Sequence, residues 1–418
     1  MFLLVDCNNF YTSCEEVFNP KLKDKMVVVL SNNDGCIIAR SKKAKENGIG
    51  MGEPIFNYKS LIDRKKLIIF SSNFTLYADI SQRVQQVLLT FDLDMEIYSI
   101  DEAFLFADML SQDQLIKLAF SMKEKIYKWC GIPVSIGISK TKTLAKLANK
   151  IAKKSSSGIC FLFNDTEIKN ALKNTKIEDV WGIGRKYQKK LKSLSIFTAK
   201  NLIDQNDEFI KKNLTVSGLR TSLELRGKSC IDLEDITTFQ KSILFSRSFS
   251  NKLTSFFDLK EAISTFVSSS AKKLRKQKMM ARYMSIFIAT SYFDKKNTFY
   301  ANSSHLNFPF PTYFTSDLIK FADMALKKIY RPNIEYKRAG ILLGNFSNEN
   351  IFQMDLFSSP LSFEKKKRLI KAIDKINQKQ KKRSVFFAAE GLNPKWENTP
   401  INKSCKYTTS WDELPKIR

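Results

Sequence analysis

The first strand predicted in this chain ends in an acidic residue, and that placement restricts how the chain can fold. Phe2–Val5 is a short run of apolar and branched residues typical of a buried strand, and Asp6 follows it directly. A carboxylate at the end of a buried strand is energetically costly unless it reaches solvent or a cation. The fold must therefore give Asp6 one of these two partners.

A second acidic feature, the adjacent pair Asp101 and Glu102, lies between two β-rich runs within residues 95–107. Neighbouring carboxylates repel each other, and a divalent ion relieves that repulsion. With Asp6, three carboxylates from two neighbouring strands can hold two Mg²⁺ ions about 3.5–4 Å apart, an arrangement used for phosphoryl transfer. The alternative is that Asp6 caps a turn and the pair faces water at a hairpin. Spacing alone favours this alternative, because acidic pairs are common.

The chain has a single histidine, His305, among 418 residues. This count argues against a Ser–His–Asp triad, a multi-histidine zinc centre and a histidine-based iron site. A bound metal would be held by carboxylates, which favours Mg²⁺ or Mn²⁺ over zinc. The seven cysteines include no CxxC pair and indicate free thiols rather than disulfides or a zinc knuckle.

No run of apolar residues is long enough to span a membrane, and the N-terminus lacks the basic start of a signal peptide. We therefore expect a soluble, cytoplasmic protein without membrane contact.

Positive charge is distributed unevenly along the chain. The formal net charge is +27, yet residues 1–100 contain 12 basic and 12 acidic side chains, so the whole excess lies downstream. This asymmetry favours a front end that performs chemistry and a back end that binds a polyanion such as nucleic acid. Lysine enrichment from an AT-biased genome is the alternative explanation, although it should not spare residues 1–100.

The pattern of apolar residues predicts a multidomain protein of the α/β and α+β classes. Strands alternate with helices over residues 1–165. Within this region, residues 139–154 predict a helix whose second face carries Lys146, Lys150 and Lys153. A mixed α/β domain is therefore expected at the N-terminal end.

The remaining chain divides by composition. Residues 166–235 look helical, and residues 232–240 form a polar connection typical of a linker. Residues 242–346 alternate basic helices with strands and predict an independent α+β module. The final stretch, 348–418, includes ten basic residues and one acidic residue within 365–383.

Three motifs in sequence order resemble the palm of Y-family translesion DNA polymerases: DCNNFYTSCEEVFNP, SIDEAF and SIGISKTKTLAKLANKIAKK. The resemblance implies a right-hand arrangement of palm, fingers, helical thumb, little finger and C-terminal extension. The expected boundaries are 1–10 and 73–165 for the palm, 11–72 for the fingers, 166–235 for the thumb with a helix-hairpin-helix, 242–346 for the little finger and 348–418 for the extension.

The resemblance also implies the catalytic residues. Asp6, Asp101 and Glu102 correspond to the ligands of two Mg²⁺ ions, with Mn²⁺ as an alternative, and the backbone carbonyl of Cys7 joins them. Tyr11 matches the family's steric gate. An aromatic ring beneath the sugar clashes with a 2′-hydroxyl, so deoxynucleotides are selected by repulsion. Without the motif, Tyr11 would be taken for a core tyrosine at a helix start.

The expected nucleotide site includes Phe10 beside the gate and three lysines for the triphosphate, Lys42, Lys45 and Lys153. Many relatives have Tyr and Arg where this chain has Lys42 and Lys45. Lysine binds phosphate as a point charge without the bidentate fork of arginine. Lys45 and Lys153 are the stronger candidates, and isolated lysines of this kind are more often solvated surface residues.

Two further regions are expected to bind DNA. In Val180–Gly184, Gly182 and Gly184 precede a helix beginning near Arg185, so free backbone N–H groups can receive a phosphate, although a simple helix–helix turn fits equally well. In the little finger, basic side chains are expected to follow duplex phosphates: Lys272, Lys273, Arg275, Lys276, Lys278 and Arg282.

A short peptide past the little finger resembles the sequence by which bacterial polymerases bind the sliding clamp. It consists of Gln353, Met354, Asp355, Leu356 and Phe357. The glutamine would supply hydrogen bonds, while the leucine and phenylalanine would fill an apolar pocket.

The segments SNNDGCIIAR, FFAAEGLNPKW and KYTTSWDEL resemble the UmuC subfamily, whose members are catalytic subunits of bacterial DNA polymerase V. That resemblance implies error-prone synthesis in the SOS response on primer-template DNA with dNTPs. It implies a dimer of processed UmuD (UmuD′), the RecA filament with ATP and the sliding clamp as partners, and association with the nucleoid when active. A stand-alone DinB-type polymerase and an inert DNA-binding scaffold with a polymerase fold are the alternatives. A nucleotidyl cyclase is disfavoured by the helix-hairpin-helix.

Overall fold

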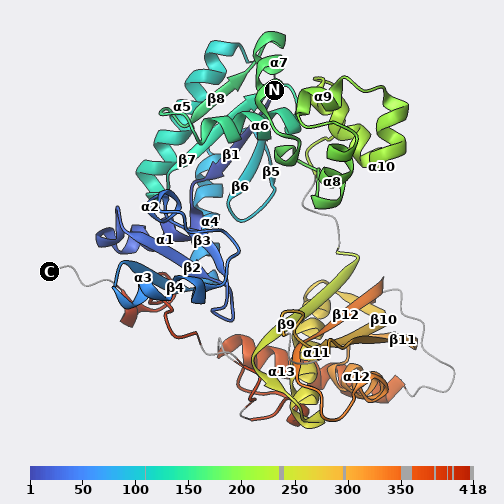
Figure 1. Cartoon of the computed structure of the whole chain (residues 1–418). Helices are drawn as coiled ribbons and strands as arrows, with labels where there is room; N and C mark the ends of the chain where they lie inside the picture. The colour runs from blue at the N-terminus through green and yellow to red at the C-terminus, as the bar shows by residue number, and fades with distance from the viewer. Residues whose placement is uncertain are drawn as a thin grey trace. The chain divides into compact units, whose positions relative to one another are not determined.

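The computed structural model describes residues 1–108, 110–234, 240–294, 298–349, 360–380, 383–392, 394–397 and 400–414. These residues form two compact units (Figure 1), Met1–Thr237 with Pro400–Arg418 and Thr238–Thr399. Across the described residues, no helix combines the length and the apolar character needed to cross a membrane.

The largest sheet of the first unit has the strand order β5-β6-β1-β7-β8. Its strands are β1 Phe2–Cys7, β5 Asp94–Ile97, β6 Glu102–Phe106, β7 Val134–Ser139 and β8 Ile159–Leu162. The strand β1 is central and pairs antiparallel with both β6 and β7. All six residues of β1 are buried, because helices cover both faces of the sheet, which explains its unbroken apolar run.

Three helices provide that cover: α4 Phe74–Leu89, α5 Gln112–Cys130 and α6 Lys142–Ala152. The first two share a core with Leu3 and Val5, whereas α6 packs on the face that carries Phe2 and Leu4. A Cβ atom at Gly137 would lie 2.1 Å from the backbone nitrogen of Asn149 in α6. Glycine is therefore needed in β7 for α6 to approach the sheet this closely.

A smaller sheet has the order β3-β2-β4, with β2 Met26–Leu30, β3 Ile37–Arg40 and β4 Leu67–Ser71. Short helices accompany it: α1 Phe10–Phe18, α2 Lys42–Glu46 and α3 Lys59–Asp63. A helical region follows, and its apolar core is shared with α6: α7 Asp165–Asn174, α8 Arg185–Ser193, α9 Ala199–Ile203 and α10 Asp207–Leu225. The strands predicted at Phe2–Val5 and Met26–Leu30 are confirmed.

The second unit is built on a four-stranded antiparallel sheet of order β11-β10-β12-β9. Its strands are β9 Ser242–Leu253, β10 Met279–Ala289, β11 Ala301–Thr312 and β12 Tyr336–Asn348. Helices α11 Phe256–Lys276 and α12 Thr315–Ile329 share one apolar core with the sheet, and α13 Pro360–Lys379 packs beside them.

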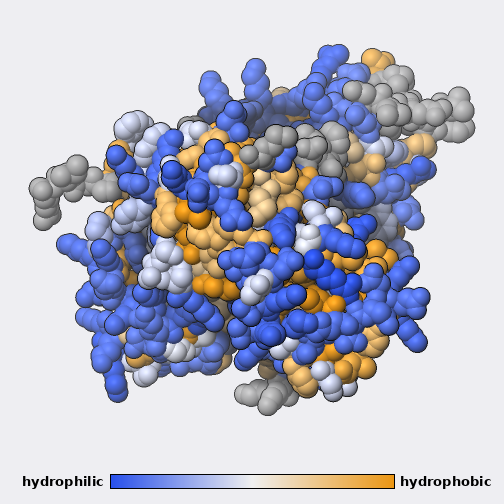
Figure 2. Space-filling model, turned by 90° about the horizontal axis from the view of Figure 1, so that it is seen from above, coloured by the Kyte–Doolittle hydropathy of each residue, from blue (hydrophilic) through white to orange (hydrophobic). Residues whose placement is uncertain are grey.

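Residues 348–418, predicted as one extension, are divided in the structure. Helix α13 and Trp396 pack within the second unit, whereas the segment from Pro400 onward belongs to the first. On the face shown in Figure 2, hydrophilic side chains predominate, as expected for a chain with 69 Lys and Arg residues.

Candidate active site

The pairing of β1 with β6 brings two of the predicted carboxylates together. Asp6 lies directly opposite Glu102 in the strand register. Asp6 is only 5% exposed, and Glu102 is half-buried. Next to them, the backbone N–H of Cys7 donates a hydrogen bond of 2.8 Å to the carbonyl oxygen of Asp101. The two strand ends therefore place all three acidic residues at one edge of the sheet.

Helix α6 and its C-cap supply the cations that these carboxylates need. Lys153 Nζ lies 2.6 Å from Asp6 Oδ2. Lys146 Nζ lies 3.1 Å from both carboxylate oxygens of Glu102 and 4.3 Å from the centre of the Tyr98 ring. Asp6 and Glu102 are thus each paired with one lysine.

The pKa of Asp6 is raised to about 7, mainly because burial disfavours its charged form. Lys153 opposes this rise, and the neighbouring Glu102 adds to it. Two carboxylates face each other here across paired strands in a poorly solvated position. A divalent cation stabilises such an arrangement better than a single ammonium group does.

A cleft of about 460 Å³ opens in front of these acids. Its lining includes Asp6, Glu102, Lys45 and Lys153, which come from four different elements or their ends. Lys42 is not part of the lining, and its ammonium lies 4.0 Å from Glu46 in an exposed pair. The structure therefore brings two of the three predicted phosphate-binding lysines to the acids.

The third carboxylate is held differently. Ser99 Oγ donates a hydrogen bond of 2.6 Å to Asp101 Oδ1, and Asp101 lines a separate small pocket together with Cys7. Among the described residues, no group of three or more His, Cys, Asp or Glu side chains is arranged as a metal site. Asp6 and Glu102 nevertheless offer the carboxylate oxygens that Mg²⁺ and Mn²⁺ prefer, so the donor chemistry fits such an ion.

Tyr11 lies in a cluster of aromatic rings at the start of α1. Its ring stacks on Tyr77 at 4.5 Å with an interplanar angle of 16° and contacts Phe74 edge-on at 5.9 Å. The neighbouring Phe10 is buried, whereas Tyr11 is only half-buried. An anchored ring that still reaches the surface is suited to contact a bound sugar.

The glycine turn before α8 adopts the geometry that its sequence requires. Gly182 has φ +87°, a left-handed conformation that favours glycine, and a Cβ atom there would lie 2.9 Å from Thr221 Oγ1. Gly184 is the N-cap of α8, and Arg185 begins the helix in an exposed position. The adjacent Trp181 lines the cleft and donates a hydrogen bond of 3.1 Å to the Tyr98 hydroxyl.

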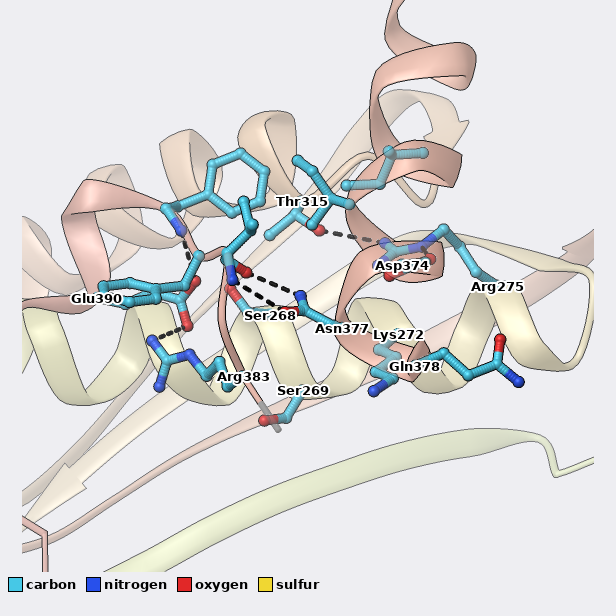
Figure 3. Close-up of a pocket in the computed structure, with 15 residues that line it drawn as sticks. Ser268, Ser269, Lys272, Arg275, Thr315, Asp374, Asn377, Gln378, Arg383 and Glu390 are labelled. Atoms are coloured by element: carbon cyan, nitrogen blue, oxygen red, sulfur yellow. Dashed lines mark hydrogen bonds and ion pairs between the residues drawn. The ribbon is translucent and has the colours of Figure 1, made fainter. Parts of the chain in front are cut away.

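The basic stripe on α11 consists of residues with two different environments. Lys272 and Lys273 are exposed, whereas Arg275 is engaged by α13, as Figure 3 shows. Its Nε and Nη2 atoms lie 2.6 and 2.9 Å from the two carboxylate oxygens of Asp374. Its Nη1 atom donates to the Tyr313 carbonyl and the Thr315 hydroxyl, each at 3.1 Å. Arg275, predicted to contact DNA phosphates, is instead occupied by protein groups.

The predicted clamp-binding residues Gln353, Met354, Asp355, Leu356 and Phe357 lie outside the residues that the structure describes. Lys146 and Tyr77 are residues of the site that the sequence analysis did not assign to it.

Lys146 was placed on the polar face of its helix, and its spacing of seven residues from Lys153 is a signal that both lysines point to the same side, where they contact Glu102 and Asp6. Tyr77 has no comparable local signal.

Models of known protein families match most of the chain. The impB/mucB/samB family matches residues 5–150, its C-terminal domain matches residues 240–356, and the IMS family HHH motif matches residues 165–196. A domain of unknown function matches residues 367–417.

The chain is also similar over its whole length to individual proteins. It is 38% identical to protein UmuC of Salmonella typhimurium over 100% of both chains and 38% identical to protein ImpB of the same species, also over 100% of both. It is 27% identical to DNA polymerase IV of Oceanobacillus iheyensis over 94% of this chain and 92% of the other. Among solved structures, a Y-family DNA polymerase chimera of Dbh and Dpo4 shares the fold with a TM-score of 0.68 and 21% identity, covering 83% of this chain and 99% of the other.

Proposed function

The chain belongs to the impB/mucB/samB family, and on that premise we propose that it is a Y-family, UmuC-type DNA polymerase. It copies a DNA template by transferring nucleotides to a primer 3′-hydroxyl, and it performs error-prone translesion synthesis in the SOS response. Dependence on a divalent metal ion is part of this proposal, and the carboxylate oxygens of Asp6 and Glu102 support it.

One observation carries the catalytic assignment: the strand register sets Asp6 against Glu102 at the wall of a cleft that also contains Lys45 and Lys153. Acids at the ends of paired strands attract a divalent cation, and lysines on the same wall attract the phosphates that accompany it. These two features together fit nucleotidyl transfer better than either does alone.

We assign the metal site to the side chains of Asp6, Asp101 and Glu102 and to the Cys7 carbonyl, with two Mg²⁺ ions as the expected occupants and Mn²⁺ as an alternative. When bound, the metal activates the primer hydroxyl and neutralises charge on the transferred and leaving phosphates. Because no described histidine lies in the cleft, we assign no histidine general base.

The nucleotide would be held by groups on the same wall. Lys45 and Lys153 bind the triphosphate as point charges, and the ammonium of Lys153 exchanges its partner Asp6 for a phosphate oxygen. Tyr11, with Phe10 beside it, excludes the 2′-hydroxyl of a ribonucleotide. We assign no phosphate-binding role to Lys42, because its ammonium pairs with Glu46 and the residue does not line the cleft.

DNA phosphates are assigned to the turn at Gly182 and Gly184, to Arg185, and to the exposed Lys272 and Lys273. Arg275 receives a different role, the docking of α13, because its guanidinium is already satisfied by protein groups. The predicted DNA-binding surface is therefore retained without Arg275.

The chain acts on DNA and nucleotides, and we propose more specific partners from its subfamily. These are a UmuD′ dimer, the RecA filament with ATP, and the sliding clamp bound through Gln353–Phe357. The expected location is the cytoplasm, with nucleoid association when active.

A stand-alone DinB-type polymerase is a second candidate, because the similarity to DNA polymerase IV spans most of the chain. The two candidates differ in their need for accessory subunits. A DinB-type enzyme extends a primer at its full rate without UmuD′ and RecA, whereas a UmuC-type enzyme is strongly stimulated by them.

Primer extension tests the proposal directly. The full chain is incubated with primer-template DNA, dNTPs and Mg²⁺, with and without UmuD′ and activated RecA, on undamaged and abasic templates. We expect extension past the abasic site that EDTA abolishes and that Mg²⁺ or Mn²⁺ restores. Absence of template-directed extension under all these conditions would contradict the assignment and favour an inert scaffold.

A further inference from the structure

The segment after Pro400 returns to the first unit and continues the small sheet β3-β2-β4 at its β4 edge. The backbone N–H of Ser71 donates to the Asn402 carbonyl at 2.9 Å, and Ser71 forms a parallel bridge with Lys403. The N–H of Asn402 in turn donates to Ser71 Oγ at 3.1 Å. Figure 1 shows this red C-terminal segment next to the blue elements β4 and α3. An edge strand is thus covered by a peptide distant in sequence.

From this bridge, a continuous set of contacts leads to the proposed steric gate. Ser404 Oγ donates to Glu15 Oε1 at 3.0 Å, and the Tyr77 hydroxyl donates to the same oxygen at 2.7 Å. The Tyr77 ring stacks on Tyr11 at 4.5 Å. Asn73 Nδ2 also donates a hydrogen bond of 2.9 Å to Ser404 Oγ, which holds this hydroxyl in place. One acidic side chain therefore joins the C-terminal segment to the residue under the gate.

Three members of this set are almost completely buried, whereas Ser404 is half-buried. Glu15 is 1% exposed, Tyr77 0% and Asn73 1%. Burial raises the pKa of Glu15, while its hydrogen bonds from Tyr77 and Ser404 oppose that rise. A buried carboxyl group that loses a donor must find another or rearrange. Loss of the Ser404 hydroxyl is therefore expected to shift Glu15 and, with it, Tyr77, because water has little access to replace the lost donor.

Attachment of the segment alone does not require this polar connection. The Tyr407 ring stacks on Phe18 at 4.7 Å with an interplanar angle of 3°, and the Ser71 N–H donates to the Asn402 carbonyl. Both contacts attach the segment without involving Glu15. A hydroxyl directed onto the buried acid that also anchors Tyr77 indicates a second role, because such a polar connection orients its partners more tightly than apolar contact does.

We propose that the C-terminal segment is a positioning element for sugar discrimination, in which Ser404 acts through Glu15 and Tyr77 to fix the orientation of Tyr11. The inference rests on the proposed function, in which Tyr11 excludes the 2′-hydroxyl. Ser404, Glu15 and Tyr77 are positioning residues, since none of them touches the nucleotide in this assignment. Ser404 lies within residues 367–417, which match a domain of unknown function.

The test compares dCTP with CTP in primer extension by full-length variants. Ser404→Ala removes one donor to Glu15, and Tyr77→Phe removes the other while retaining the ring. Ser404→Thr keeps the hydroxyl and is the rescuing variant, and Thr409→Ala is the matched control in the same segment, at an exposed residue. Tyr11→Ala gives the ratio expected when the gate is lost.

We expect Ser404→Ala and Tyr77→Phe each to lower the ratio of kcat/KM for dCTP to that for CTP by about three- to thirty-fold, as for loss of one buried hydrogen bond. The change should come mainly from a lower KM for CTP. Ser404→Thr and Thr409→Ala should retain the wild-type ratio, whereas Tyr11→Ala should lower it most.

A readout independent of catalysis accompanies the kinetics. Hydrogen exchange at the amides of α1 should rise in Ser404→Ala and stay unchanged in Thr409→Ala. An unchanged ratio together with unchanged exchange in both Ser404→Ala and Tyr77→Phe would overturn the inference. Absence of extension by the wild-type chain even with UmuD′ and activated RecA would instead refute the proposed function, and the exchange data alone would then decide whether the segment is coupled to α1.

Discussion

The two most informative ion pairs of this protein differ in how available their cations are. In the cleft, Lys153 pairs with Asp6, yet 44% of the lysine side chain stays exposed. Between α11 and α13, Arg275 pairs with Asp374 and its side chain is only 13% exposed. A lysine ammonium can move to a new anion with little reorganisation, whereas a bidentate guanidinium is fixed by its geometry. We therefore interpret the first pair as part of the proposed active site and the second as a structural joint between α11 and α13.

The largest effect on activity is expected from substitution of Asp6. We expect Asp6→Asn to lower the single-turnover rate of nucleotide incorporation by at least about a thousandfold, because it removes a metal ligand. The free energy of unfolding should stay the same or rise, because the substitution also removes a buried negative charge that faces Glu102. Rapid-quench primer extension and urea unfolding measure the two effects. A rate within tenfold of wild type would remove Asp6 from the site.

For the Arg275–Asp374 pair we expect the opposite, a loss of stability with little change in activity. Arg275→Ala leaves the partly buried Asp374 unpaired and should lower the unfolding free energy of the second unit by about 2–3 kcal/mol, a figure reduced from that of a fully buried pair because Asp374 is partly exposed. The incorporation rate at saturating DNA should change by less than about threefold.

Urea unfolding of the full chain measures this loss, and a double-mutant cycle with Asp374→Ala isolates the contribution of the pair. If Arg275→Ala left stability unchanged but weakened DNA binding in a salt-dependent way, Arg275 would be a phosphate contact, as its sequence position suggested.

The smallest effect is expected at the neighbouring lysine, which serves as the matched control. Lys273→Ala should reduce the slope of log affinity against log salt concentration by about 1 and weaken primer-template binding at all sequences alike. Unfolding free energy should change by less than about 0.5 kcal/mol, since the side chain is exposed. Fluorescence anisotropy at several salt concentrations measures the slope. An unaltered slope would exclude Lys273 from the DNA surface.

The sequence predicted the strand ends that carry the candidate acids, because local patterns specify strands. Apolar runs of strand length placed Asp6 and Glu102 at strand ends, and the 3.6-residue period of α6 placed its lysines on one face. The hydrogen bond that turns Asp101 toward Ser99 depends on side-chain packing that no periodicity encodes.

The contacts of Arg275 and Ser404 could not be predicted from the sequence for a different reason. In the sequence, Arg275 looks the same as Lys272 and Lys273, and its occupied state follows from α13, which begins more than 80 residues later. Ser404 contacts Glu15 across a separation of 389 residues. Contacts between such distant segments leave no local pattern, so charge and periodicity predict the kind of surface but not which of its members are already engaged.

Direct measurement of bound metal tests the central claim, that the acids at the ends of β1 and β6 form the metal site. Electron paramagnetic resonance can count Mn²⁺ bound to the full chain with a dideoxy-terminated primer-template and the matching dNTP. We expect two ions per wild-type chain and at least one fewer in Asp101→Asn and in Glu102→Gln. Equal Mn²⁺ binding by wild type and both variants would contradict the account.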